Sequence, residues 1–409
     1  MISLNKIFYG LFILMLIVGV YTYQMMWFQS SDEIITLLLA LLCIVDILGN
    51  RNHQRYKGLF FIIGVMTFYL LYSLFVVHYN TPKAVFSDFF IQLKPFIAFY
   101  VAYSMGVRFN ASQRLFLKKL TAFLSAMMLV IIVSGFGKEV FFHVAYYGIY
   151  SIVLFLIYYY CSYRNQTQKD KIIMLLILAV GFFSTRSKFY GFFVVALYLL
   201  FVYKPGMLAK VKLKQWIMMA VVFCLVLYVA WGKINYYFIS SGLFSGSDEM
   251  DYSFARAILY FTAPQVLSDH LLFGSGLASY ATYSSGQVGY SLIYGIYNID
   301  IIWGLLEGDC PFVSDTFFPE LAQFGIVGIG LYFYFWIWVY KKIKIRTVTP
   351  HAIQLYKLGL LILAFVFIES IAGSMFLQAS GSMVMMILGF VIRDMSTINQ
   401  QAQVAERKL

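Results

Sequence analysis

Long apolar runs that recur along the chain constrain its fold more than any other feature. Twelve runs approach the roughly 17 to 25 apolar residues that span a bilayer as a helix. Unpaired backbone N–H and C=O groups cannot face hydrocarbon, so each run is predicted to cross as an α-helix. The composition agrees, because 62% hydrophobic and 12% charged residues leave too little polar surface for soluble domains. We therefore expect an all-α, polytopic membrane protein.

The predicted membrane helices leave one long segment between them. They cover residues 7–23, 34–49, 59–79, 85–106, 120–136, 143–162, 172–185, 189–203, 216–233, 320–340, 357–373 and 379–393. The chain is thus divided into nine N-terminal helices (1–233), a long loop (234–319), three C-terminal helices (320–393) and a tail (394–409).

The distribution of Lys and Arg predicts how the helices are oriented. With the N-terminus inside, 23 of the 30 Lys and Arg residues fall on the cytoplasmic side, six fall outside and Lys94 lies within a helix. Both termini are therefore predicted to be cytoplasmic. The net charge of +12 is spread over separate cytoplasmic segments instead of forming one basic face, which argues against nucleic acid as a partner.

The long loop is predicted to lie outside and to carry the function. It holds nine of the chain's 18 acidic residues, counting Glu320 at its edge, and a single cation, Arg256. Arg256 either pairs with Asp251 or another nearby acid, or holds a phosphate, for which its planar guanidinium is well suited. An alternative reading makes residues 288–306 a further membrane helix, which would place the basic residues after 340 outside, against the charge rule.

Three more cations are predicted near the outer face. Arg186 and Lys188 lie in a short turn between two helices, where they either bind a ligand or reach lipid phosphates. Lys94 lies inside a helix. It either binds the same ligand as Arg186 and Lys188 or pairs with a buried acid of another helix, such as Glu369. Four cations could bind a pyrophosphate, and their place at a membrane face favours a lipid-linked diphosphate.

Four motifs occur in a characteristic order. They are STRSK at 184–188, RAILY at 256–260, DHLLFGSG at 269–276 and SDTFFPELAQFGIVG at 314–328. Together with the helix count and the long loop, they resemble the O-antigen polymerase and O-antigen ligase superfamily. Asp315 stands where the ligase pattern has His, and Gln323 where an acidic residue is common, so the resemblance favours a polymerase of O-antigen or capsular polysaccharide.

The resemblance implies a fold, a location and partners. It implies a C-type glycosyltransferase-like bundle in the bacterial inner membrane that uses glycans carried on undecaprenyl diphosphate as donor and acceptor. Membrane lipids and a chain-length regulator protein are the further partners; no cofactor, metal or nucleic acid is expected. A ligase that transfers glycan to lipid A core is the alternative enzyme, and a flippase or transporter of lipid-linked oligosaccharide is the alternative outside enzymes.

Candidate site residues follow from the chemistry of glycosyl transfer. Arg186, Arg256, Lys188 and Lys94 would stabilise the leaving diphosphate. Asp315 is the first candidate for the base that deprotonates the acceptor hydroxyl and His270 the second, although Asp315 could instead cap a helix and His270 be an ordinary loop residue. Gly274, Gly276 and Glu320 are assigned to the substrate loop. Loop tyrosines, among them Tyr280 and Tyr294, could stack on sugars or simply favour the membrane interface.

Overall fold

The described part of the structure, a computed structural model, is helical. It comprises residues 4–22, 30–49, 53–204, 255–345 and 349–406, together with five single positions between 221 and 235. No strand occurs in these ranges, only one isolated bridge between Leu306 and Asp309. The prediction of an all-α protein is confirmed for this part of the chain.

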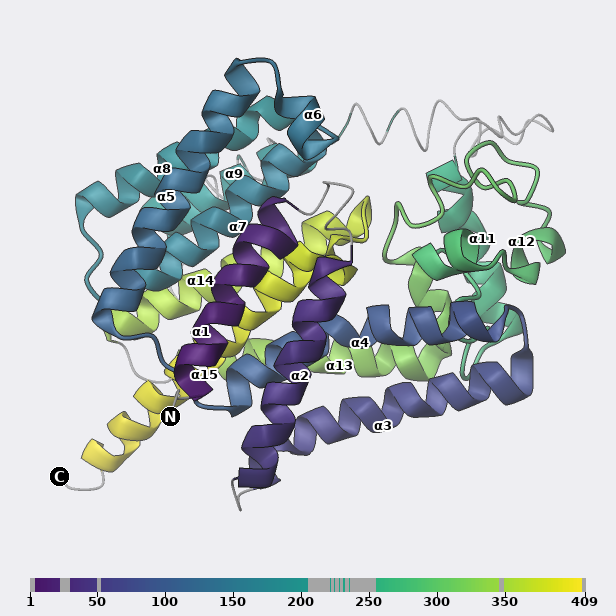
Figure 1. Cartoon of the computed structure of the whole chain (residues 1–409), viewed down its shortest axis with the longest axis horizontal. Helices are drawn as coiled ribbons and strands as arrows, with labels where there is room; N and C mark the ends of the chain where they lie inside the picture. The colour runs from purple at the N-terminus through teal and green to yellow at the C-terminus, as the bar shows by residue number, and fades with distance from the viewer. Residues whose placement is uncertain are drawn as a thin grey trace.

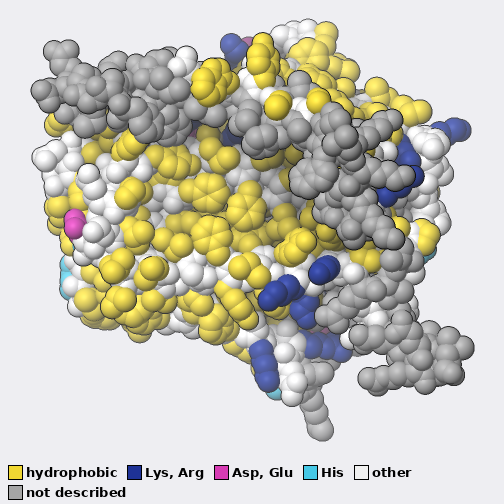
Figure 2. Space-filling model, turned by 180° about the vertical axis from the view of Figure 1, so that it is seen from behind, with side chains coloured by type: hydrophobic (Ala, Val, Ile, Leu, Met, Phe, Trp, Pro, Cys, Tyr) yellow, Lys and Arg dark blue, Asp and Glu magenta, His cyan; other side chains and the backbone are white. Residues whose placement is uncertain are grey.

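Eight helical segments of the described chain are long and apolar enough to cross a membrane. They are Leu4–Tyr21 (α1 and η1), His53–Val77 (η3, α3 and η4), Pro82–Ser104 (α4), Ala111–Val133 (α5), Ala145–Ser162 (α7), Pro319–Ile343 (η10 and α13), Pro350–Ile371 (α14) and Ala379–Gln401 within α15. The protein is therefore a polytopic helical membrane protein. Figure 2 shows hydrophobic side chains covering much of one face, as lipid contact requires.

Three other predicted membrane helices fall on helical segments of different character. Residues 34–49 belong to α2 (Ser31–Gly49), which carries Asp32, Glu33 and Asp46. Residues 172–185 fall on α8 (Gln168–Val180) and η5 (Gly181–Ser184), and residues 189–203 on α9 (Ser187–Leu197) and η6 (Tyr198–Val202). The twelfth, 216–233, lies outside the continuously described ranges. The count of twelve remains a prediction.

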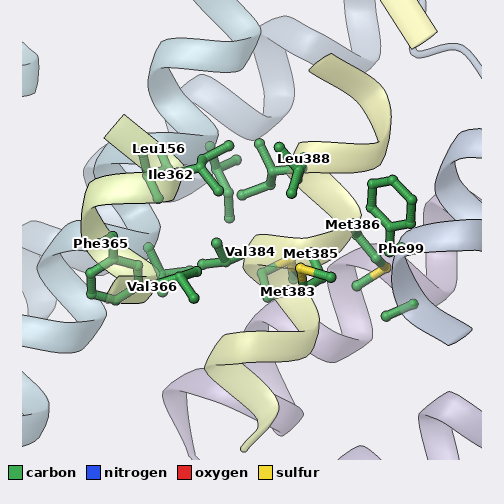
Figure 3. Packing of buried hydrophobic residues seen from close by; sticks show 14 of the residues in the cluster. Phe99, Leu156, Ile362, Phe365, Val366, Met383, Val384, Met385, Met386 and Leu388 are labelled. Carbon is green, nitrogen blue, oxygen red and sulfur yellow. The ribbon is translucent and has the colours of Figure 1, made fainter. Parts of the chain in front are cut away.

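Helix α15 (Ala379–Glu406) forms the centre of the bundle. It packs against α4, α7, α13 (Gly325–Ile343) and α14. Figure 3 shows Met383 to Met386 of α15 between Phe99 of α4 and Phe365 and Val366 of α14, all buried. The helix continues to Glu406, so most of the predicted tail 394–409 is helical. No Pro or Gly follows Gly389 to end it.

Helices α7 and α3 show the two kinds of membrane helix in this bundle. In α7, 89% of the most apolar stretch is buried. In the segment that contains α3 (Lys57–Tyr72), only 17% of the most apolar stretch is buried. A helix that is apolar all round and buried belongs to the interior. Figure 1 accordingly places α3 along one edge of the molecule, with α4 next to it on the inner side.

The described part of the long loop folds into a unit with its own apolar core. It contains α11 (Ala255–Asp269), η9 (Ser284–Val288) and α12 (Leu292–Ile296), which lie together at one side of the molecule (Figure 1). Leu259, Val266 and Ile293 are among its buried residues. The alternative membrane helix at 288–306 is wrong, because α12 spans five residues and turns follow it.

Candidate functional site

The predicted cations Arg186 and Lys188 lie at the start of α9: Arg186 is in the turn that precedes the helix, and Lys188 is its second residue. The chain leaves η5 at Ser184, and Thr185 reverses it with a φ of 50°. Arg186 is extended and precedes the first residue of α9. The buried Ser184 hydroxyl accepts a bond from the Arg186 N–H at 3.4 Å, which fixes the turn. Both cations are therefore held by backbone geometry at the end of a helical hairpin.

The C-terminal end of α14 gathers three separate segments. The last carbonyls of a helix have no partner within it, so they can accept bonds from elsewhere. The Ser370 carbonyl accepts from Phe317 N–H at 3.2 Å, the Ile371 carbonyl from Tyr260 Oη at 2.6 Å, and the Ala372 carbonyl from Lys188 Nζ at 3.1 Å. These donors belong to the segments that carry Asp315, Arg256 and Arg186.

Arg256 and Asp315 meet across this junction, although 59 residues separate them in sequence. Arg256 Nε donates to Asp315 Oδ2 at 3.1 Å, and Arg256 Nη2 donates to the same oxygen. The side chains retain 26% and 31% of their exposure, so a ligand can reach them. The expected pairing of Arg256 with an acid is therefore present, with Asp315 as a partner; Asp251 lies outside the described residues.

Asp315 does not begin a helix. It lies in a turn, and its backbone N–H donates to the Phe312 carbonyl at 3.1 Å. The next helical segment is η10 (Pro319–Phe324), for which Phe318 is the N-cap residue. The alternative reading of Asp315 as a helix cap is therefore wrong, and its carboxylate faces Arg256.

Lys188 forms an ion pair with Glu369 of α14. Lys188 Nζ lies 2.5 Å from Glu369 Oε2, and the two side chains are 19% and 3% exposed. Glu369 is thus the partner of Lys188 and not of Lys94. The pair neutralises Lys188 and fixes the hairpin turn against α14.

Removing Glu369 should destabilise the protein more than removing the whole pair. Glu369→Ala leaves the Lys188 ammonium without its partner, which costs about 3 kcal/mol of unfolding free energy. Replacing both residues with Met should cost less, because no charge remains to be desolvated. Unfolding in mixed detergent micelles measures both values, and a double variant less stable than Glu369→Ala would contradict this account.

His143, which the sequence reasoning missed, completes the site. It lies between α6 (Gly137–Phe141) and α7, and Arg186 Nη2 is 2.9 Å from its Nε2. Burial and the Arg186 guanidinium lower the pKa of His143 from its ordinary 6.5; Asp315 opposes this shift, and Arg256 and Lys188 add to it. A histidine beside an outer helix end was the available signal. We call the six residues that meet here the polar cluster: His143, Arg186, Lys188, Arg256, Asp315 and Glu369.

Acid should weaken the contact between His143 and Arg186. Arg186 has only donors, so Nε2 must be unprotonated to accept. Because the folded pKa lies below 6.5, this contribution to stability is complete above pH 6.5 and is lost as the pH falls through the folded pKa. The melting temperature should fall more between pH 7.5 and 5.5 in the wild type than in His143→Gln, whose amide oxygen accepts at every pH. Equal falls in melting temperature in the two proteins would refute this role of the His143 contact.

One of the predicted diphosphate-binding residues, Lys94, and one of the predicted bases, His270, lie outside the polar cluster. Lys94 of α4 forms ion pairs with two acids of α2, the buried Asp32 at 2.5 Å and the partly exposed Glu33 at 2.9 Å. His270 follows the last residue of α11, whereas Arg256 is near the first; fourteen residues of helix put them about 21 Å apart. Its Nε2 lies 2.8 Å from Tyr79 Oη.

Gly274, Gly276 and Glu320 belong to a buried junction beneath the loop unit. Gly276 N–H donates to the Gln323 carbonyl at 2.9 Å, and Gly274 has a φ of 72° with its α-carbon against the Gln323 backbone. Glu320 is fully buried and accepts a bond from Gln92 of α4. The structure thus places this motif in the packing of the loop against the membrane helices, apart from the polar cluster.

Buried tyrosines support the loop unit. Tyr280 and Tyr294 are fully buried, with hydrogen bonds of 2.6 Å to the Leu259 carbonyl and to Ser285 Oγ. They are core residues, so stacking on a sugar is excluded for them. Tyr283 is 53% exposed.

The fold and the polar cluster define a helical membrane protein with a charged, partly exposed site at one end of its bundle. No protein-family model matches this chain, and no curated protein sequence does. The inference about function therefore rests on the motifs and on the geometry of the polar cluster.

Proposed function

We propose that this protein is a glycosyltransferase that polymerises bacterial O-antigen or capsular polysaccharide. It would transfer a growing glycan from undecaprenyl diphosphate to the next lipid-linked repeat unit at the outer face of the inner membrane. One observation carries the proposal: Arg186, Arg256 and Asp315, from distant parts of the sequence, converge at the end of α14.

The charge of the polar cluster suits a diphosphate. With His143 neutral, it contains three cations and two carboxylates, and so carries a net positive charge. Lys188 is neutralised by Glu369, while Arg186 contacts His143 and forms no ion pair in the described part of the chain. Arg186 and Arg256 are therefore assigned to the diphosphate, since guanidinium groups bind phosphate oxygens in a bidentate manner. Lys188 and His143 position the turn and Arg186.

The proposed step is a direct displacement at the anomeric carbon. The acceptor hydroxyl oxygen forms a bond to C1 of the donor sugar, and the bond between C1 and the diphosphate oxygen breaks. The electron pair of that bond leaves with the diphosphate, where Arg186 and Arg256 stabilise the developing charge. The hydroxyl proton passes to the Asp315 carboxylate. This displacement inverts the anomeric centre and needs no further reactant.

The preference for a polymerase over a ligase rests on Asp315. Position 323, the other departure from the ligase pattern, is fully buried in the junction with Gly276 and contributes nothing to the polar cluster. Asp315 pairs with Arg256 at the point where an acceptor would meet the diphosphate.

Purified protein and one synthetic lipid-linked repeat unit provide the test. Chains of two or more repeat units, formed without any other acceptor, would support the polymerase. Transfer only after addition of lipid A core would establish the ligase instead. Movement of the substrate across a proteoliposome membrane without any new glycosidic bond would establish the transporter and overturn the proposal.

A further inference from the structure

A second candidate site is an elongated cavity of about 790 Å³ between α3, α4, α13 and the C-terminal half of α15. Its volume is that of a pocket for a sizeable organic molecule. Aromatic side chains form much of its wall, among them Phe96 and Tyr100 of α4 and Phe335 and Trp338 of α13. In the bilayer such a wall favours hydrocarbon over water.

The cavity is as deep as one leaflet of a membrane. Along α3 its lining extends from Lys57 to Tyr69, twelve residues and therefore about 18 Å of helix. Half of a typical hydrocarbon core is about 15 Å. An acyl chain that enters beside Lys57 would thus end near Tyr69. The much longer polyprenyl chain of the proposed donor would not fit.

One end of the cavity is basic. Arg55, Lys57 and Arg108 line it there, and all three are exposed. In the described part of the chain none of them forms an ion pair, whereas Lys94, Lys118 and Lys188 each do. The Ser104 hydroxyl donates to the Arg55 carbonyl at 3.0 Å, which holds the start of α3 against the end of α4.

This basic end is the one that the distribution of Lys and Arg predicts to be cytoplasmic. Three cations that form no ion pair with any described residue lie at the mouth of an apolar cavity, and they match a molecule with an anionic head and a long hydrocarbon chain. The cytoplasmic leaflet supplies such molecules, and basic residues near its surface attract their anionic head groups.

We propose that the cavity binds an anionic glycerophospholipid of the cytoplasmic leaflet. Its phosphate lies among Arg55, Lys57 and Arg108, and one acyl chain follows the aromatic wall toward Tyr69. The site is at the opposite end of the bundle from the polar cluster by the predicted orientation, and it does not depend on the proposed enzymatic function.

Native mass spectrometry of the full chain, released from nanodiscs of equal parts phosphatidylglycerol and phosphatidylcholine, tests the proposal. The wild type should retain phosphatidylglycerol over phosphatidylcholine by about tenfold. The triple variant Arg55→Gln, Lys57→Gln, Arg108→Gln should lose this preference. The matched control Lys6→Gln, Lys119→Gln, Lys169→Gln removes three exposed cations that do not line the cavity, and should keep it.

A second variant tests whether the apolar part of the cavity binds the acyl chain of the lipid. Val65→Trp fills the cavity from α3 and leaves the three cations in place, so bound lipid should be lost while the protein stays monodisperse in size-exclusion chromatography. Equal loss in both triple variants, no preference in the wild type, or retention by Val65→Trp would overturn the proposal. So would stronger retention of an added polyprenyl phosphate than of phosphatidylglycerol.

Discussion

Arg256→Ala should reduce polymer formation at least about 100-fold, the scale on which loss of one preorganised electrostatic contact slows a reaction. The variant removes a cation that is within reach of ligand and leaves the Asp315 carboxylate without its partner. Arg186→Ala should act similarly, since Arg186 is held beside the same group of charges. The measurement is the length distribution of glycan made by purified protein from one lipid-linked repeat unit.

Lys83→Ala is the matched control, because Lys83 is exposed, is predicted to face the same side and lies outside the polar cluster. It should make chains of normal length at a normal rate. Asp315→Asn separates two roles of this carboxylate. If Asp315 is the base, kcat should fall while KM stays nearly unchanged. If Asp315 only positions Arg256, KM should rise. Normal chains from both arginine variants would refute the assignment.

Gly274→Ala should prevent most of the protein from reaching its folded state. A β-carbon at this position would collide with the backbone of Gln323 and with the N–H of Gly325, and the φ of 72° is unfavourable for alanine. Backbone atoms cannot move aside as a flexible side chain can, so the cost should exceed about 4 kcal/mol, which is at the upper end for single substitutions. The yield of monodisperse protein after purification in mild detergent measures it.

Gly330→Ala is the matched control for this glycine. Gly330 lies within α13, and beyond the helix's own backbone no atom of the described residues lies within 4 Å of the place of an added β-carbon. Alanine is the better helix former by about 1 kcal/mol, so yield should be unchanged or higher. Equal yields from the two variants would show that the Gly274 junction is not close-packed.

The lengths of the apolar runs and the positions of the charged residues predict much of this fold from the sequence. Apolar runs of membrane length locate the helices, and the STRSK turn is where the prediction puts it, because Arg and Lys interrupt an otherwise apolar stretch. The same reasoning fails where the packing of distant segments determines which charged side chains contact each other. Nothing local indicates that Asp315 faces Arg256, or that Glu369 is the partner of Lys188 and leaves Lys94 to Asp32 and Glu33.

The glycine motif shows a second limit of sequence reasoning. A Gly-x-Gly in a polar loop is compatible with binding a substrate and equally with a close approach of two backbones. Only the three-dimensional structure shows that Gly276 bonds to the Gln323 carbonyl. His143 illustrates the converse limit: its place beside a helix end is visible in the sequence, but its contact with Arg186 Nη2 appears only in the folded structure.

The end of α14 has a consequence for how such a site can change over time. Its contacts to Phe317, Tyr260 and Lys188 are made by backbone carbonyls at 370–372, which every amino acid possesses. The side chains of Ile371 and Ala372, which are not buried, can therefore be exchanged while the gathered segments stay together. A shift of the helix end by one residue, by contrast, would move all three segments at once. The site should tolerate substitution here and resist insertion or deletion, so its architecture can outlast recognisable similarity between sequences.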